Sequence, residues 1–375
     1  MNGSIRVGNL FGIPFFVHGS WFLVLLLVTA SYGTNLAASF PQLGLLAWLL
    51  GLVTALGVFA SVLAHELGHS WVALRQGIDV KSITLFLFGG LANLERESET
   101  PAEAFSVAIA GPAVSIALFG LFFAIAQLTP VSGPLAAVVS LLASVNLILA
   151  LFNLIPGVPL DGGNVLKAAV WKVTGNPYKG VVFASRVGQA IGWIGIVSGL
   201  VPLFAYGSFN GIWNVLIGWF LLQNAGRSAQ AASLQQKLSD LTVKEAVTPD
   251  SPIVPESLSL RQFANEFVIG QTQWRRFLVV NESGQLVGTI AAEDMKTIAT
   301  SEWPQVSVQE LTKSLDEYPT IAADRTLLEA VNILEERQLN EIPAIDENGM
   351  LVGLLQKNQV IRLLQKDAQA LSTAS

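Results

Sequence analysis

The sequence predicts a polytopic α-helical membrane protein with about six transmembrane helices, followed by a cytoplasmic α/β domain. Two observations predict this fold class. The chain of 375 residues is 52% hydrophobic and 13% charged, whereas soluble proteins average about 25% charged. The charges are also segregated, because residues 1–226 hold 15 charged residues and residues 227–375 hold 33. The first part is therefore expected in a membrane and the second in water.

Six apolar segments are interpreted as spans of a bilayer, each of which needs about 20 residues. They are residues 15–32, 43–74, 102–128, 135–152, 181–204 and 211–222. The second is longer than a bilayer core requires, so its last turns are expected close to the far membrane boundary. Residues 1–12 lack the pattern of a cleavable signal, so the first span is expected to stay in the protein.

The loops alternate in charge, and this predicts the orientation. Residues 33–42, 129–134 and 205–210 carry no charge. The opposite side holds Arg6, Arg75, Lys81, Arg96, Lys167, Lys172, Lys179 and Arg227. Because basic loops stay in the cytoplasm, the chain is expected to be a multi-pass protein with both termini cytoplasmic, in a plasma membrane or an organelle membrane.

Composition also excludes some functions. The chain has no cysteine, which excludes disulfides and thiolate zinc sites and leaves metal binding to His, Asp and Glu. The net charge is about +1 for residues 1–226 and −7 for the rest. Neither part has the basic surface that nucleic acid requires, so no nucleic-acid partner is expected.

A motif of polar residues interrupts the second span. It is His65-Glu66-Leu67-Gly68-His69, within a segment where a carboxylate costs at least about 2.5–3.5 kcal/mol. Residues i and i+4 share one face of a helix, so both imidazoles can bind one cation while Glu66 stands beside them. The spacing is typical of a zinc hydrolase.

A catalytic zinc usually has three protein ligands, so a third is needed. Asp161 lies just past the fourth span, in a bend rich in proline and glycine, and on the same side of the membrane as the two histidines. Such a bend would unwind a helix beside a cavity. His18, at the start of the first span, is the rival ligand.

The order of these motifs is similar to that of the site-2 protease family of intramembrane zinc metalloproteases. The resemblance is carried by the HELGH motif, by Ala110-Gly111-Pro112 in the next span and by the Asn…Pro…LDGG motif around Asp161. Phe88-Gly89-Gly90 also resembles that family's segment at the membrane edge. The resemblance implies one Zn²⁺ per chain, held by His65, His69 and Asp161, with Glu66 as the general base.

Four further residues are candidates for contacts with the substrate. Asn146 and Asn153 flank the expected site, and are interpreted either as donors to the oxyanion or the substrate backbone, or as hydrogen-bonding links between helices. Gly89 and Gly90 lie in an apolar segment too short to cross the membrane, which predicts a strand pair or a re-entrant piece. A substrate helix must be unwound before cleavage, and this segment is expected to hold it by strand pairing.

The second part of the chain contains a repeat. Residues 277–288 return as residues 342–353, each reading strand, glycine turn, strand, with a helix before and after. These copies resemble a pair of CBS domains, a family that often binds adenosyl nucleotides. In the first copy Asp294 is retained as a nucleotide contact while Ala291 replaces the expected hydroxyl residue, so dimerisation or docking is the alternative role.

The expected domains are therefore a membrane-embedded metalloprotease at 1–226, a linker at 227–240, CBS repeats at 241–298 and 315–364, and a tail at 365–375. The expected function is cleavage of single-pass membrane proteins near the cytoplasmic face, that is, regulated intramembrane proteolysis, with membrane lipids around the enzyme. The CBS pair would regulate it, and could also form a homodimer. The alternative is a CBS-regulated transporter or channel, although no inverted repeat is evident.

Overall fold

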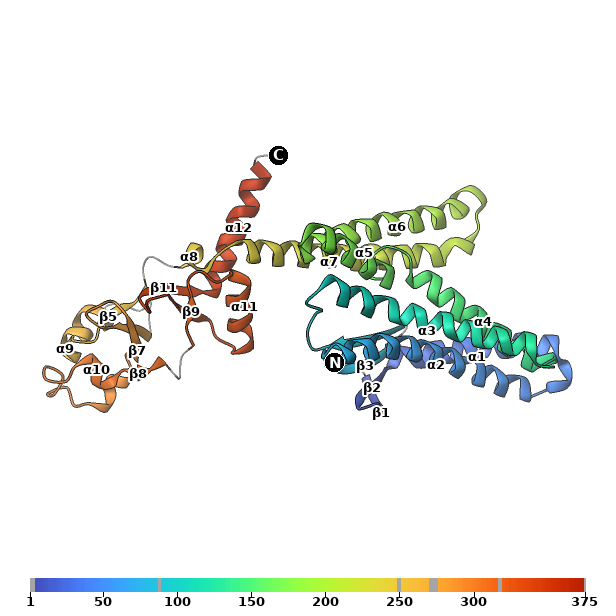
Figure 1. Ribbon diagram of the computed structural model, residues 1–375, viewed down its shortest axis with the longest axis horizontal. Helices are drawn as coiled ribbons and strands as arrows, with labels where there is room; N and C mark the ends of the chain where they lie inside the picture. Colours follow the sequence, from blue (N-terminus) through green and yellow to red (C-terminus); the bar gives the residue numbers. More distant parts are fainter. Residues whose placement is uncertain (1–3, 87–88, 248–250, 270–275, 316–318, 374–375) are drawn as a thin grey trace. The chain divides into compact units, whose positions relative to one another are not determined.

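The computed structural model describes residues 4–86, 89–247, 251–269, 276–315 and 319–373, with side chains up to residue 365. It divides into two compact units, Met1–Ser233 and Leu234–Ser375, which are described separately (Figure 1).

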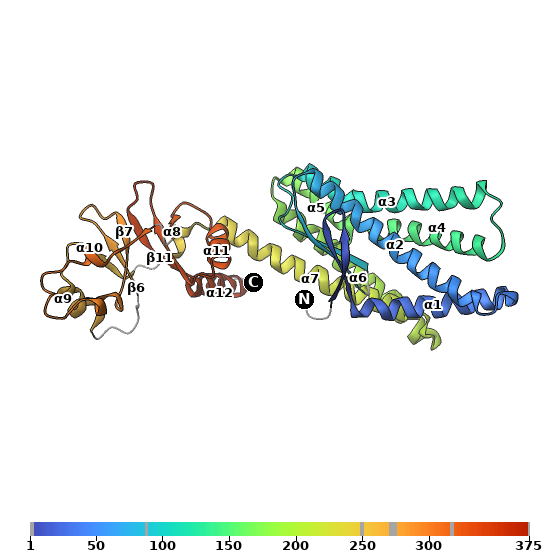
Figure 2. The ribbon, with the colours of Figure 1, turned by 90° about the horizontal axis from the view of Figure 1, so that it is seen from below.

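Among the described residues of the first unit, five helices are long and apolar enough to cross a membrane. They are α1 (Gly19–Ser39), α2 (Leu46–Arg75), α3 (Pro101–Leu128), α4 (Gly133–Asn153) and α6 (Pro177–Tyr206). Helices α1, α2, α3 and α4 pack as successive neighbours, and they run alongside one another in Figures 1 and 2. The shorter α5 (Asp161–Thr174) packs against α3 and α6. The first unit is thus the polytopic helical domain that the sequence predicts.

The ends of these helices are set by local capping. The Thr100 side chain accepts a hydrogen bond from the main-chain N–H of Glu103 at 3.2 Å, and Pro101 takes the first position of α3. The Asn176 side chain caps α6 in the same way, followed by Pro177. A side-chain acceptor before the helix and a proline at its first position both satisfy or remove free N–H groups. The two helices therefore begin at defined residues.

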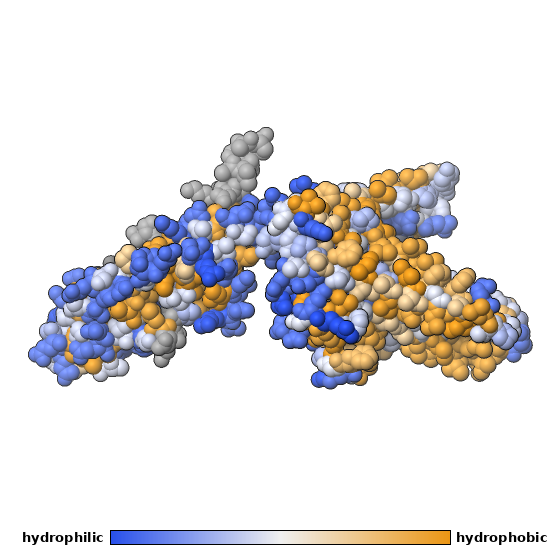
Figure 3. All heavy atoms as spheres, in the orientation of Figure 1, coloured by the Kyte–Doolittle hydropathy of each residue, from blue (hydrophilic) through white to orange (hydrophobic). Residues whose placement is uncertain are grey.

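The outer surface of the first unit is apolar. Leu26 is 65% exposed, Ile148 64% and Trp193 56%, and Figure 3 shows hydrophobic atoms over much of this unit. Exposed apolar area of this extent would be unfavourable in water, where large patches mark an interface. On helices of this length, it is the surface expected against acyl chains.

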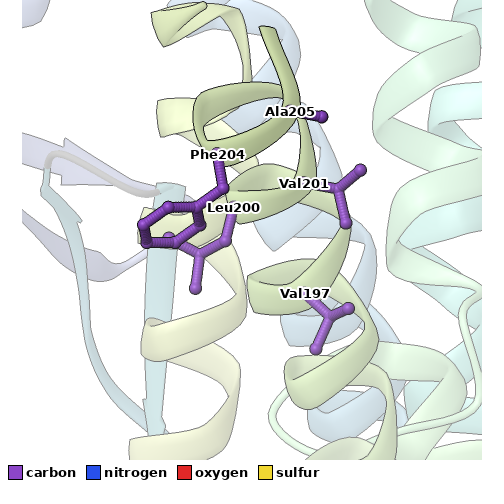
Figure 4. Close-up of a pocket in the computed structure, with 5 residues that line it drawn as sticks. All are labelled: Val197, Leu200, Val201, Phe204 and Ala205. Carbon is purple, nitrogen blue, oxygen red and sulfur yellow. The ribbon is translucent and has the colours of Figure 1, made fainter. Parts of the chain in front are cut away.

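A shallow hollow on the outer face of α6 has the same character. Val197, Leu200, Val201, Phe204 and Ala205 line it (Figure 4). All five are apolar and lie on a candidate membrane span. The hollow therefore offers no group for chemistry.

A four-stranded sheet lies at one end of the helices. Its strands are β1 (Ser4–Leu10), β2 (Ile13–His18), β3 (Val80–Phe86) and β4 (Gly89–Leu94), in the order β1-β2-β3-β4. Strands β2 and β3 are parallel, and the other neighbours are antiparallel. The sheet packs on the end of α2 through Ile13, Ala73, Ile78 and Ile83. The segment around Gly89 and Gly90 is therefore a strand pair, with β4 at the edge of the sheet.

Three segments differ from the sequence-based expectation. Residues 15–18 belong to β2, so the first span begins at Gly19, because Phe15 and Val17 pair with β3 instead of starting a helix. Residues 161–174, expected as part of a loop, form α5. The sixth expected span is the first part of α7 (Ile212–Asp240), and the polar second half of this helix keeps it outside the five candidate spans. Residues 227–240, expected as a linker, form that second half of α7.

The second unit contains two small sheets, β5-β6-β7-β8 and β11-β10-β9. Its strands are β5 (Ile253–Pro255), β6 (Arg276–Val280), β7 (Leu286–Ala291), β8 (Lys313–Ser314), β9 (Ile321–Ala322), β10 (Glu341–Ile345) and β11 (Leu351–Gln356). Its helices are α8 (Val243–Ala246), α9 (Leu260–Phe263), α10 (Val308–Leu311), α11 (Leu327–Glu336) and α12 (Lys357–Thr373). Short helical turns also occur at Pro41–Leu43, Phe209–Gly211, Ala264–Val268 and Asp294–Thr297.

The two copies of the repeat pair with each other. Each strand–turn–strand has a glycine with φ of 78°, at Gly284 and Gly349. The main-chain N–H of Leu286 donates to Gly349, and that of Leu351 donates to Gly284, at 3.2 and 3.1 Å. Leu278, Leu286 and Leu354 form a shared cluster beneath these turns. The predicted pair of α/β repeats is confirmed.

Candidate metal centre

Helix α2 places both histidines of the motif on one face. His65 and His69 are one turn apart, and their Nε2 atoms are 3.3 Å from each other. His65 is 3% exposed. Two imidazoles buried at this spacing cost free energy unless they share a partner that accepts their lone pairs or protons.

Asp161 completes the cluster from a different part of the chain. It is the first residue of α5, directly after the bend that follows α4. The adjacent Gly162 leaves no room for a side chain, because a Cβ there would overlap the carbonyl of Leu154 and lie 2.5 Å from that of Ile155. The close approach of α5 to the bend therefore positions the Asp161 carboxylate opposite α2.

The three residues lie close enough to share one zinc ion, because one ligand atom from each lies within 4.8 Å of the others. Asp161 Oδ2 lies 3.0 Å from His65 Nε2, and Asp161 Oδ1 lies 3.3 Å from His69 Nε2. Atoms about 2.0–2.1 Å from a tetrahedral zinc are about 3.3 Å from one another. Two imidazoles and one carboxylate are also a donor set that catalytic zinc uses. This cluster is the candidate metal centre among the described residues.

Helix α3 supplies a partner for each imidazole on the side away from the centre. The hydroxyl oxygen of Ser115 is 2.9 Å from His65 Nδ1, and the carbonyl of Val107 is 2.7 Å from His69 Nδ1. Between them lies Gly111, where a Cβ would overlap His69 Nε2 and lie 2.7 Å from His65 Nε2. These residues occur at intervals of four and so lie along one stripe of α3.

Glu66 projects toward the sheet instead of joining the three donors. The main-chain N–H of Ala92 in β4 faces its carboxylate. A Cβ on Gly90 would overlap Glu66 Cγ and lie 2.8 Å from its Cδ. The edge strand therefore passes in contact with this carboxylate, which explains why glycine stands at residue 90.

A cavity of about 640 Å³ connects these groups. Its wall includes the three donor residues, Glu66, strand β4, and side chains of α5 and α7. An ion pair between Lys167 and Glu97, at 2.8 Å, also borders it. Glu66, the three donor residues and strand β4 therefore border one common space.

The two asparagines have different surroundings. Asn146 is fully buried, and its Nδ2 donates to Ser61 Oγ at 2.9 Å and to the Leu142 carbonyl at 2.8 Å. Both of its amide hydrogens are therefore used, one between α4 and α2 and the other within α4. Asn153 borders the cavity, and its Nδ2 donates to the carbonyl of Leu149 at 3.0 Å, which leaves one hydrogen.

The structure does not bring His18 into the cluster. Its Nδ1 accepts a hydrogen bond from the main-chain N–H of Ser20 and so caps α1. The parallel pairing of β2 with β3 holds this residue at the end of its strand. Among the described residues, the group that could hold a metal ion consists of His65, His69 and Asp161 and does not include His18, whose role as the alternative ligand stays a prediction. Gly89 and Gly90 lie in β4, whereas Phe88 is outside the described residues.

In the second unit, Asp294 is engaged within its own repeat. Its carboxylate accepts hydrogen bonds from the main-chain N–H of Ala291 at 2.9 Å and from Lys313 Nζ at 2.8 Å. Partial burial opposes its ionisation, but Lys313 and the Ala291 N–H together hold the pKa of this carboxyl below its ordinary value. A nucleotide hydroxyl would therefore compete with two existing partners.

Sequence reasoning missed Ser115, Val107, Ala92 and the Lys167–Glu97 pair. A main-chain carbonyl or N–H leaves no signal in the sequence, so Val107 and Ala92 could not be found. Ser115 had a weak signal, because it follows Gly111 by four residues on the helix after the HELGH motif.

Comparisons with known proteins identify two families along the chain. The chain matches the family model of peptidase family M50 at residues 53–132 and 127–195, and that of the CBS domain at residues 243–299 and 308–366. A provisionally named zinc metalloprotease from Synechocystis is 54% identical over 98% of this chain and 97% of its own length. A second, from Mycobacterium tuberculosis, is 34% identical over 97% of this chain and 93% of its own length.

Among solved structures, the site-2 protease from Methanocaldococcus jannaschii matches 60% of this chain and 95% of its own, at 29% identity and a TM-score of 0.43. The relatives of nearly full length establish the family. The chain therefore belongs to peptidase family M50, the site-2 protease family, as an integral membrane metalloprotease that carries a pair of CBS domains.

Proposed function

We propose that this protein is an intramembrane zinc endopeptidase that cleaves membrane-spanning substrates near the cytoplasmic face. The observation that carries the proposal is the convergence of three zinc-type donors and one carboxylate on a single cavity. His65 and His69 come from a candidate span, Asp161 from α5, and Glu66 from the same turn of α2. Membership of a peptidase family favours this function over a transporter or channel.

His65, His69 and Asp161 would hold one Zn²⁺ through Nε2, Nε2 and the carboxylate. When bound, the metal supplies Lewis-acid polarisation of the scissile carbonyl and activation of water. The carboxylate of Asp161 also balances part of the ion's charge within a low-dielectric site. These three residues would therefore bind and position the metal ion, and proton transfer would be left to Glu66.

Glu66 is proposed as the general base. The Glu66 carboxylate lies beside the Ala92 N–H in the wall of the cavity that the three donor residues also line. Glu66 would accept the proton of the attacking water and then deliver it to the leaving nitrogen. A carboxylate one residue from a metal ligand serves this role in HExxH hydrolases.

Strand β4 is proposed to hold the substrate. In an antiparallel ladder, successive residues direct their N–H groups to opposite sides. Since the Ala92 N–H is directed to Glu66, the N–H of Gly90 is expected to face the same side. An extended substrate could pair there by strand addition, with its amide beside Glu66. Asn153 is proposed as a further donor to the substrate backbone, and Asn146 as a link between helices.

The partners follow from this proposal. The substrate is a single-pass membrane protein that reaches the cavity through the lipid, and both termini of the enzyme are cytoplasmic. The CBS pair is proposed as a regulatory unit, through homodimerisation or an adenosyl nucleotide. ATP and AMP titrated against the full chain test the nucleotide. A rise in the melting temperature of the second unit supports it, and no change up to millimolar ligand refutes it.

One experiment tests the proposed function. The detergent-purified protein and its Glu66→Gln variant are compared for zinc content and for cleavage of a membrane-spanning peptide. We expect about one zinc per chain in both proteins and cleavage by the parent alone. A folded parent without zinc would refute the proposal, as would equal cleavage by the two proteins.

A further inference from the structure

The outer side of the metal centre is built by one helix. Helix α3 packs on α2 with Val107 beside His69 and Ser115 beside His65. The residue number falls along one helix as it rises along the other, so the two helices are antiparallel. Val107 and Ser115 are eight residues apart, or about two turns, while the histidines are one turn apart.

An imidazole that binds a metal through Nε2 is constrained at its other nitrogen. The neutral ring has one N–H, and this must be on Nδ1 when Nε2 carries the lone pair. Nδ1–H then needs an acceptor, and that acceptor fixes both the tautomer and the rotation of the ring. For His65, the atom in reach is the hydroxyl oxygen of Ser115, at 2.9 Å.

Both residues of this contact are buried, which leaves His65 Nδ1 without water as another acceptor. Ser115 is 0% exposed and His65 is 3% exposed. Water is therefore excluded from the Nδ1 side of the ring, so a lost hydroxyl is not replaced by solvent. For His69 the acceptor is the main-chain carbonyl of Val107, which every side chain at that position retains.

We propose that Ser115 is a positioning residue for His65, and that its hydroxyl oxygen holds the ring in the tautomer that presents Nε2 to zinc. This inference rests on the proposed zinc function and extends it to a residue that touches neither metal nor substrate. Among the described contacts of the two imidazoles, the Ser115 hydroxyl is the side-chain acceptor at Nδ1, so its removal should be visible in metal affinity itself.

The test measures zinc affinity in the full-length protein by competition with a chelator of known affinity. Ser115→Ala removes the hydroxyl, and Ser115→Thr keeps it. The matched control is Ser185→Ala, because Ser185 is equally buried on α6 and its hydroxyl has no hydrogen-bond partner among the described residues. Melting of the zinc-free proteins shows whether each variant is folded.

Removal of an outer partner typically weakens metal affinity by about 10–100-fold. We expect a loss in this range for Ser115→Ala, affinity within about threefold of the parent for Ser115→Thr, and no change for the control. Parent-like affinity in Ser115→Ala would overturn the inference. An equal loss in the alanine and threonine variants would also overturn it, because packing and not the hydroxyl would then be responsible.

A second pair of variants and the zinc content of the parent protein complete the test. If Ser115→Ala does not fold, Ser115→Thr is compared with Ser115→Val, which has the same shape without the hydroxyl, and the same loss is expected in the valine variant. Equal zinc affinity in that pair overturns the inference. A parent that binds no zinc would overturn the proposed function as a whole, which is a different result from a parent and a Ser115→Ala variant that bind zinc equally.

Discussion

A methyl group at Gly111 should remove the metal. Gly111 lies on α3 between the two partners of the imidazoles, facing the Nε2 atoms of His65 and His69. Alanine is favoured over glycine inside a helix by about 1 kcal/mol. Because Pro112 follows directly and its ring crowds a Cβ on the preceding residue, melting of the zinc-free Gly111→Ala protein must first show that α3 is retained while the methyl group fills the space beside the donors.

The size of the effect follows from the geometry. The new Cβ would overlap His69 Nε2 and lie 2.7 Å from His65 Nε2. Non-bonded heavy atoms separate to about 3.5 Å, so His65 must move by about 0.8 Å even if His69 absorbs the overlap. Metal–ligand distances tolerate about 0.2 Å. We expect zinc affinity to fall at least 100-fold, or about 2.8 kcal/mol.

The assay is chelator competition on the purified protein, with cleavage of a membrane-spanning peptide measured in parallel. Gly120→Ala is the control, since it lies on the same helix and a Cβ there meets nothing within 4 Å. The control should bind zinc and cleave as the parent does. Parent-like zinc affinity in a folded Gly111→Ala protein would refute the assignment of the Nε2 atoms of His65 and His69 as zinc donors.

Three further predictions concern other parts of the chain. Gly90→Ala places a Cβ against Glu66, so kcat should fall at least about tenfold while metal analysis finds unchanged zinc; loss of zinc as well would contradict the assignment. Asn146→Ala removes two hydrogen bonds between and within helices and should lower the free energy of unfolding by about 1 kcal/mol; a tenfold loss of kcat/KM would instead restore its role at the oxyanion. Asp294→Asn removes the ion pair with Lys313. Because the folded pKa of Asp294 is lowered, its stabilisation is present above the unfolded value of about 4 and is lost as the pH falls further. Denaturation should show a deficit of about 0.5–1 kcal/mol at pH 7 that shrinks by about pH 3, and an equal deficit at both would refute it.

The candidate site was largely predictable because a membrane penalises polar residues. The chain has three histidines, and two of them fall in an apolar span, where a polar group needs a partner or a function. The same reasoning selected Asp161. It did not separate Asn146 from Asn153, because a sequence does not show which amide hydrogens are already used within the protein.

The misplaced boundaries have a common physical origin. Residues 15–17 are apolar and aromatic, and a short apolar run does not distinguish the start of a helix from a buried strand. Their pairing with β3, 68 residues further on for Phe15 and Ile83, decided the outcome. In helix α5, two glycines follow the first residue, Asp161, and the helix comes after a bend rich in proline, which is the composition of a loop. Its packing on α3 and α6 overrides that local preference.

The three candidate zinc ligands lie far apart in the sequence, and this has a consequence for biogenesis. His65 and His69 leave the ribosome with the second helix, Ser115 follows with the third, and Asp161 appears only after the fourth. Domains are made from the amino terminus onward during synthesis, so an unfinished chain holds two donors and lacks the third. A polypeptide whose translation stops before residue 161 would therefore remain an inactive precursor, and competence to cut neighbouring membrane proteins would arise only once the fifth helix has been made.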